Sequence, residues 1–275
     1  MQVEFYGVRG SCPCSSEAML RYGGNTACVA LTVEGEPPIV FDLGTGLRGF
    51  GATQPTDGSF RGVALVTHIH WDHIQGLPFF PPADRHGAEL DIYGPEQDGG
   101  DLGTVFDDFM RPPYFPVRVS DLRGRIEFHA VHTGELELGH ARVLVRPVPH
   151  VGPTVGYRVT WQGATVTYIS DHQAPVDLEA VDDGVLELAA GADLLVHDAQ
   201  YTRSEFEEKS HWGHCTTDYA LRVAQEAGVG RLAMFHHDPA HDDATIDRLL
   251  AETRAMAHGS GVEVVAAYEG LRLIL

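Results

Sequence analysis

Seven consecutive residues decide the fold of this chain, and they read Thr67-His68-Ile69-His70-Trp71-Asp72-His73. They follow Val63–Val66, a short apolar run that predicts a buried strand. Four metal-capable side chains therefore stand within the six positions 68–73. Such a loop is costly to bury without a bound partner, because imidazole and carboxylate groups lose their hydration there. The pattern predicts a metal site.

Three further metal-capable residues stand at or just after predicted strands. His150 follows a strand predicted over 141–148, Asp171 one over 164–169, and His236 one over 231–235. Loops at strand ends are where a rigid scaffold usually presents catalytic groups. We therefore expect four strand ends to converge and to supply five histidines and two aspartates as ligands.

This ligand set predicts two divalent ions, since it exceeds what one tetrahedral zinc ion needs. Imidazole and carboxylate suit zinc, with manganese as the alternative. A water between two such ions loses a proton near neutral pH and becomes a nucleophile. His237 remains an alternative ligand to its neighbour His236. The expected arrangement places the first ion on His68, His70 and His150 and the second on Asp72, His73 and His236, with Asp171 bridging.

The composition of the 275-residue chain limits its partners. It has 39 acidic and 19 basic residues and a formal charge of −20. Nucleic-acid affinity depends on Lys and Arg meeting phosphates, so we expect a small anionic molecule and no large nucleic acid. An apolar fraction of 43% excludes a disordered chain, and no apolar run is long enough to span a bilayer. No membrane partner is expected.

The sequence also predicts a location and a domain organisation. Residues 1–30 show no secretory signal. The cysteines at 12, 14, 28 and 215 are expected to be free thiols, as in the cytoplasm. No linker or short repeat is evident, so residues 1–275 are expected to form a single hydrolase domain. The sequence leaves the oligomeric state open and is compatible with a homodimer.

The order of predicted elements is strands first, then strands mixed with helices. This order favours one α/β (α+β) domain with two sheets and flanking helices. Residues 111–116 contain three prolines and predict a rigid loop. Tyr114 and Phe115 in that loop either stack on a substrate base and cap a pocket, or pack against the protein's own core. The predicted helices cover residues 74–80, 102–110, 217–227 and 243–258.

Residues 68–73 resemble the His-x-His-x-Asp-His motif of the metallo-β-lactamase superfamily. His150, Asp171 and His236 follow in the order that this family has. The resemblance covers essentially the whole chain. It implies an αββα sandwich, two mixed sheets flanked by helices, with a dinuclear metal site between the sheet edges. It also places Asp72 among the catalytic residues as well as among the ligands.

A second resemblance narrows the branch. His211-Trp212-Gly213-His214-Cys215-Thr216 resembles the His-Ser-Thr segment of the phosphodiesterase branch, which holds tRNA 3′-processing endonucleases and small cyclic-phosphate phosphodiesterases. This implies that His214 is a general acid toward the leaving oxygen. The alternative is a structural histidine before a helix capped by Thr216 or Thr217. His197-Asp198-Ala199 resembles the Cys-Glu-Ala segment that supports that histidine, with a shorter arm at Asp198.

The opening of the chain carries a third resemblance. Residues 7–13 (GVRGSCP) and 22–26 (YGGNT) resemble the start of a cyclic-phosphodiesterase-like bacterial subgroup. The endonucleases grip tRNA with a basic, Gly/Pro-rich arm, and no such insertion is evident here. The resemblance therefore favours the small-substrate members of the branch.

Three functions stay open at this point. The first is a dinuclear phosphodiesterase that hydrolyses a small cyclic nucleotide or cyclic sugar phosphate through a metal-bridging hydroxide. The second is a lactonase or other ester hydrolase of the same fold, in which His214 would matter little. The third is a non-catalytic metal-binding sensor. The intact ligand set disfavours the sensor, because a degenerate binder would be free to lose ligands.

Overall fold

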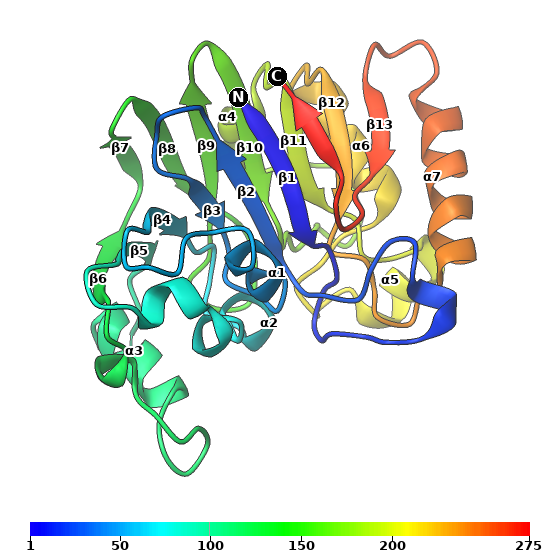
Figure 1. Ribbon diagram of the computed structural model, residues 1–275. Coiled ribbons are helices and arrows are strands. Elements are labelled where there is room, and N and C mark those ends of the chain that lie inside the picture. Colours follow the sequence, from blue (N-terminus) through cyan, green and yellow to red (C-terminus); the bar gives the residue numbers. More distant parts are fainter. Residues whose placement is uncertain (99) are drawn as a thin grey trace.

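A computed structural model describes residues 1–98 and 100–275. Two sheets pack face to face, and helices cover their outer faces (Figure 1). Within the described residues the first sheet has seven strands in the order β14-β1-β2-β3-β4-β5-β6. These strands are β1 Gln2–Gly7, β2 Cys28–Thr32, β3 Ile39–Phe41, β4 Arg61–Leu65, β5 Glu89–Pro95, β6 Arg125–Val131 and β14 Arg272–Ile274.

The second sheet runs β13-β12-β11-β10-β9-β8-β7. Strands β10 to β13 pair in parallel, whereas β7 to β10 pair antiparallel, so the sheet is mixed. The strands are β7 Gly134–Leu138, β8 Ala141–Pro147, β9 Val155–Trp161, β10 Ala164–Ile169, β11 Leu194–Asp198, β12 Arg231–Phe235 and β13 Glu263–Ala266.

The central strands of each sheet are buried on both faces, and strand β2 shows how the sequence achieves this. Val29 and Leu31 belong to the core between the sheets, while Cys28 and Ala30 belong to the core under the helices of the first sheet. Alternate side chains of a strand point to opposite faces, so a continuous apolar run fills two cores at once. The layers are therefore helix, sheet, sheet and helix.

The helices lie on the outer faces, and side chains cap the amino ends of the five that follow the first two in the chain. On the first sheet they are α1 Leu47–Gly51, α2 Trp71–Ile74 and α3 Leu102–Phe109. On the side of the second sheet they are α4 Asp183–Ala189, α5 Arg203–Lys209, α6 Thr217–Glu226 and α7 Asp243–Ala257. Thr216 caps α6 by accepting from the Tyr219 amide, as one of the two expected caps. Short 3₁₀ turns cover Glu17–Met19, Leu77–Phe79, Pro81–Asp84 and Val119–Asp121.

The predicted helix over 74–80 is wrong in its position. Helix α2 begins at Trp71 and ends at Ile74, and a separate 3₁₀ turn follows over Leu77–Phe79. Pro78 cannot donate a backbone hydrogen bond, so the first turn does not continue. Asp72 and His73 therefore lie in a helical turn rather than in a loop. Strand β7 and the short helices α1, α4 and α5 were not predicted.

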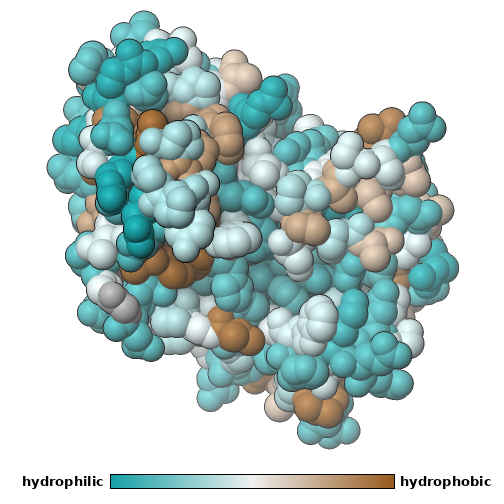
Figure 2. Space-filling view, turned by 90° about the horizontal axis from the view of Figure 1, so that it is seen from below, coloured by the Kyte–Doolittle hydropathy of each residue, from teal (hydrophilic) through white to brown (hydrophobic). Residues whose placement is uncertain are grey.

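Both ends of the chain lie in the first sheet, where β14 pairs antiparallel with β1 (Figure 1). The ends of the parallel strands, and the loops after them, gather at the lower edge of the two sheets in this view. That face is mostly hydrophilic, with separate hydrophobic patches (Figure 2). Among the described residues, no helix has the length and apolar character required to cross a membrane.

Candidate metal centre

All seven residues that the sequence nominated as ligands converge at the edge of the two sheets. Three histidines form a first group. The Nε2 atom of His68 lies 2.9 Å from Nδ1 of His70, and Nε2 of His150 lies 3.3 Å from that same Nδ1 atom. His68 and His70 follow strand β4 of the first sheet, whereas His150 follows strand β8 of the second. The two sheets thus supply one cluster of nitrogen donors.

Asp72, His73 and His236 form a second group. Oδ2 of Asp72 lies 3.2 Å from Nε2 of His73 and 3.1 Å from Nε2 of His236. Asp72 and His73 come from helix α2, and His236 comes directly after strand β12. This group also draws on both sheets.

Asp171 stands between the two groups and offers one oxygen to each. Oδ1 lies 3.2 Å from Nε2 of His73 and 3.4 Å from Nε2 of His236. Oδ2 lies 3.7 Å from Nε2 of His68 and 3.8 Å from Nε2 of His150. This is the arrangement that a bridging carboxylate requires.

Two observations indicate that the residues fit divalent ions. Nε2 of His73 and Oδ1 of Asp171 are buried and have no hydrogen-bond partner, although buried polar atoms are normally paired. Burial also lowers the pKa of His68, His70 and His150, which favours neutral rings that can donate a lone pair, whereas the carboxylates of Asp72, Asp171 and Asp42 outweigh burial and raise the pKa of His73. Converging lone pairs of neutral imidazoles and carboxylates are the donor set that zinc-like ions prefer.

Each of four ligand rings is oriented by a partner on its other nitrogen. Such contacts set the tautomer and the direction of a ligand ring. The sequence reasoning missed Asp42, Gln200 and Gly213 in this role. Asp42 could have been found, because it follows strand β3 as the other candidates follow theirs. The contacts are His68 Nδ1 to Thr67 Oγ1 at 3.1 Å, His73 Nδ1 to Asp42 Oδ2 at 2.8 Å, His150 Nδ1 to the Gly213 carbonyl at 2.6 Å, and His236 Nδ1 to Gln200 Oε1 at 2.7 Å.

Backbone strain also collects here. His236 and Asp42 have φ values of +58° and +53°, in the left-handed region that non-glycine residues rarely adopt. Each such residue costs of order 1–3 kcal/mol and persists only where its surroundings hold it. The strained residues are thus His236, a candidate ligand, and Asp42, which contacts the candidate ligand His73.

His214 lies beside the cluster and is held by Asp198. Its Nδ1 atom lies 2.9 Å from Oδ2 of Asp198, so the shorter aspartate arm does reach the ring. The same nitrogen lies 3.7 Å from Oδ2 of Asp171, and the ring stacks on that of His236 with centroids 4.9 Å apart. Burial acts to lower the pKa of His214, but the carboxylates of Asp198 and Asp171 outweigh it and raise the pKa above its ordinary value.

Two roles suit this position. A protonated imidazole beside the cluster can donate a proton. Alternatively, Asp171, His214 and His236 are close enough to hold an ion themselves. Since Nδ1 of His214 is engaged by Asp198, only Nε2 is left for either role.

The other nearby histidines do not join the cluster. Nε2 of His237 lies 2.9 Å from the Ala267 carbonyl, so this ring is directed to the backbone and the structure favours His236. His241 pairs with Glu205 at 2.9 Å. Both rings are buried. His172 is also buried and contacts His197, so it does not face solvent.

Comparisons with known proteins agree with this architecture. A family model described as a beta-lactamase superfamily domain matches residues 39–237. Ribonuclease Z of Synechococcus sp. (strain WH7803) is 25% identical over 306 residues, covering 93% of this chain and 92% of that protein.

Two solved structures share the fold. The metallo-beta-lactamase fold protein YhfI of Bacillus subtilis has a TM-score of 0.75 at 20% identity, with 99% of this chain and 98% of that chain covered. A diphosphatase from the PhnP family has a TM-score of 0.70 at 20% identity, with 100% and 97% covered. The predicted αββα sandwich is confirmed.

Proposed function

The chain belongs to the beta-lactamase superfamily and is a metal-dependent hydrolase, and from this premise we propose that it is a dinuclear phosphodiesterase that acts on a small cyclic nucleotide or cyclic sugar phosphate. The observation that carries the proposal is the position of His214. Its Nδ1 atom is held by Asp198 and also lies near Asp171, the proposed bridging ligand, which places the ring at the edge of the cluster. A proton donor at that place suits the departure of an alkoxide, which is a poor leaving group.

The proposed ligands are those that converge. His68, His70 and His150 would hold one ion, Asp72, His73 and His236 the other, and Asp171 would bridge them. Zinc is proposed, with manganese as the alternative. Divalent ions in such a set act as Lewis acids on phosphoryl oxygens and supply a hydroxide near neutral pH.

The remaining steps belong to the protein's own side chains. Asp198 accepts the Nδ1 hydrogen of His214 and thereby stabilises the protonated ring. Nε2–H of that ring then points its proton away from Asp198 and can give it to the leaving oxygen. Gln200 orients the His236 ring and Asp42 orients the His73 ring, so both residues act through the proposed ligands that they contact.

Charge supports a small substrate. The chain carries −20, whereas RNA binding draws on clustered Lys and Arg. The alignment with ribonuclease Z also spans 306 positions, while 93% of this 275-residue chain is about 256 residues, so about 50 positions lie opposite gaps in this chain. The relative therefore has segments without a counterpart here.

Cleavage of RNA is the second candidate, since the curated relative is named ribonuclease Z. A lactonase remains a third, because the same metal set would serve a carboxylic ester. A sensor without activity has no observation in its favour.

We also propose that residues 1–275 act as one domain, because β1 pairs with β14. We propose further that the protein is cytoplasmic, because all four cysteines are free.

One assay panel tests the proposal. The protein, reconstituted with Zn²⁺ or Mn²⁺, is given bis(p-nitrophenyl) phosphate, 2′,3′- and 3′,5′-cyclic nucleotides, a set of lactones, and a tRNA precursor with a 3′ extension. We expect the highest kcat/KM on a cyclic phosphodiester. Faster turnover of the tRNA precursor or of a lactone would replace the proposal by the corresponding alternative.

A further inference from the structure

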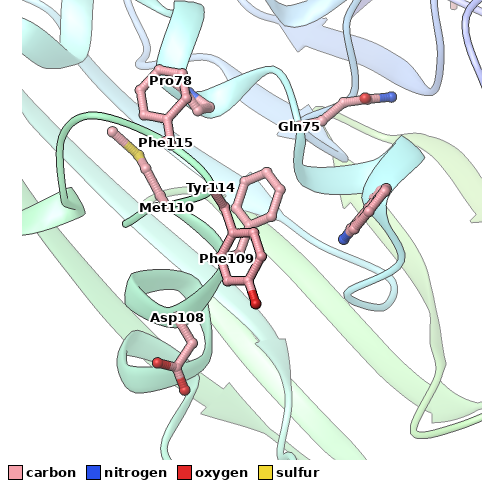
Figure 3. Close-up of a pocket in the computed structure, with 8 residues that line it drawn as sticks. Gln75, Pro78, Asp108, Phe109, Met110, Tyr114 and Phe115 are labelled. Atoms are coloured by element: carbon pink, nitrogen blue, oxygen red, sulfur yellow. The ribbon is translucent and has the colours of Figure 1, made fainter. Parts of the chain in front are cut away.

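A pocket of about 510 Å³ lies beside the proposed metal centre, and the chemistry above does not use it (Figure 3). Its volume is within the range of roughly 300–1,000 Å³ that small-molecule sites usually have. Trp71 and Gln75 of the α2 segment line it, together with Phe109 at the end of α3 and with Tyr114 and Phe115 from the loop after α3. Figure 3 shows Phe109 and Tyr114 next to each other and Phe115 beside Pro78, with Gln75 across the space from the first two.

The pocket adjoins the segment of chain that carries four of the proposed ligands. Trp71 stands between His70 and Asp72 in the sequence and begins helix α2. Trp71 and Gln75 are four residues apart and the Gln75 amide donates to the Trp71 carbonyl at 2.8 Å, so both lie on one face of the turn. Asp72 and His73 occupy other positions of the same turn and join the ligand cluster. The pocket and the cluster are therefore built from the same helical turn.

The aromatic rings of the pocket are exposed in a way that packing does not explain. Trp71 is 74% exposed and Tyr114 is 78% exposed. Phe115, in contrast, packs against Phe79 with ring centroids 5.8 Å apart and joins the core under the first sheet. The two roles considered for this loop thus fall to different residues. Phe115 packs against the core and fixes the loop, whereas Tyr114 is exposed and available for stacking. Exposed apolar surface around a pocket marks a binding site more often than chance.

We infer that this pocket receives the nucleobase of a mononucleotide substrate whose phosphodiester lies at the metal centre; this inference rests on the proposed function. Flat aromatic side chains bind bases by stacking, which accepts every base because each has a π-face. The enzyme would then prefer cyclic nucleotides to cyclic sugar phosphates and would discriminate weakly among bases. The nucleotide at the 3′ end of an RNA also carries a base beside a phosphodiester. The experiment below distinguishes a mononucleotide from such an RNA end.

The decisive variant is Tyr114→Ala, because this ring is exposed and its loss leaves the core intact. Base stacking is worth about 1–3 kcal/mol, so KM for a 2′,3′-cyclic nucleotide should rise about 5- to 150-fold while kcat stays unchanged. KM for a cyclic glycerol phosphate, which lacks a base, should not change. Tyr268→Ala is the matched control, since Tyr268 is an exposed tyrosine (42%) outside the pocket. Equal effects on both substrates, or none on either, would overturn the inference.

A binding measurement keeps this result separate from the proposed function. Adenosine, which has no phosphodiester, is titrated into a Trp212→Phe variant, in which Trp71 is the exposed tryptophan that remains among those described. We expect saturable quenching that Tyr114→Ala weakens. Quenching without any phosphodiesterase activity would retain the pocket and discard the proposed function. Phosphodiesterase activity without quenching would retain the proposed function and discard the pocket as a base-binding site. Saturation by RNA ends but not by mononucleotides would assign the pocket to RNA.

Discussion

Asp198 Oδ2 lies 2.9 Å from His214 Nδ1, and that carboxylate is completely buried. It also accepts the backbone amide of His172 at 3.0 Å, while its other oxygen accepts the amide of Gln200 at 3.0 Å. Two backbone amides thus fix the carboxylate, and the carboxylate in turn fixes the imidazole. Such a pair has the geometry of an oriented acid, and several measurable consequences depend on it.

Replacing His214 by Ala should reduce kcat on a phosphodiester with an alkoxide leaving group by about 10²–10⁴, the usual worth of a general acid. On bis(p-nitrophenyl) phosphate the loss should be much smaller, because p-nitrophenolate leaves without a proton. Metal content, measured by plasma mass spectrometry, should stay at the wild-type value. Equal losses on both substrates would remove the acid role, and loss of metal would make His214 a ligand.

Asp198→Asn should lower the same rate through His214, because the amide no longer stabilises the protonated ring. A loss of about 10²-fold or more is expected on the poor leaving group. The informative measurement is the double variant with His214→Ala. Residues that act as a unit are not additive, so Asp198→Asn should cost little once His214 is gone. Additive losses would show that Asp198 acts on the fold instead.

Asp171→Ala should cost both ions and activity together, because its two oxygens face the two ligand groups. We expect about two ions per chain in the reconstituted wild type and a rate lowered by more than about 100-fold in the variant. Asp57→Ala, an exposed aspartate, serves as the control. A wild-type protein that takes up a single ion after reconstitution would contradict the bridging role.

Gly10→Ala should weaken one ion site without unfolding the chain. A Cβ atom on Gly10 would lie 2.3 Å from Nδ1 of His236 and 2.8 Å from Oε1 of Gln200, so the ring must move and lose its partner. Loss of such outer contacts typically costs 10- to 100-fold in metal affinity. Gly49→Ala is matched to it, since its nearest contact would be an ordinary 3.5 Å to Tyr6. Competition with a chromogenic chelator measures the metal affinity of both variants.

The four cysteines should differ in their reaction with a thiol reagent. Cys12 is exposed and should react at once. Burial raises the pKa of Cys28 and Cys215 well above the ordinary value, so neither should react until the chain unfolds. Unfolding in guanidinium without reductant should then release four thiols per chain. Fewer than four would indicate a disulfide and argue against a cytoplasmic protein.

The cluster of proposed ligands was accessible to prediction because its residues obey a local rule. His150, Asp171 and His236 each follow a short apolar strand, and parallel strands bring their carboxyl ends to one edge. The helix placement failed at 74–80 for an equally local reason. Residues 71–74 form a single turn that is too short for apolar periodicity to reveal.

The partners of the ligands were beyond sequence reasoning, with Asp42 as the exception. Gln200 contacts His236 across 36 positions, and the Gly213 carbonyl contacts His150 across 63. No spacing rule connects such residues, since tertiary packing alone brings them together. Tyr114 and Phe115 show the same limit. They are neighbours of similar character, and only the fold decides that one packs and the other is exposed.

Each of the two groups of proposed ligands takes side chains from both sheets. The first group joins positions 68 and 150 of the chain, and the second joins positions 72 and 236. Ions bound there would therefore work as cross-links between distant parts of the chain, and they would favour the folded state in proportion to their free concentration. A chelator would then act on this protein as a denaturant as well as an inhibitor. Its storage life in buffer would be set by the supply of metal, and a purification that strips the ions would yield a protein that melts sooner.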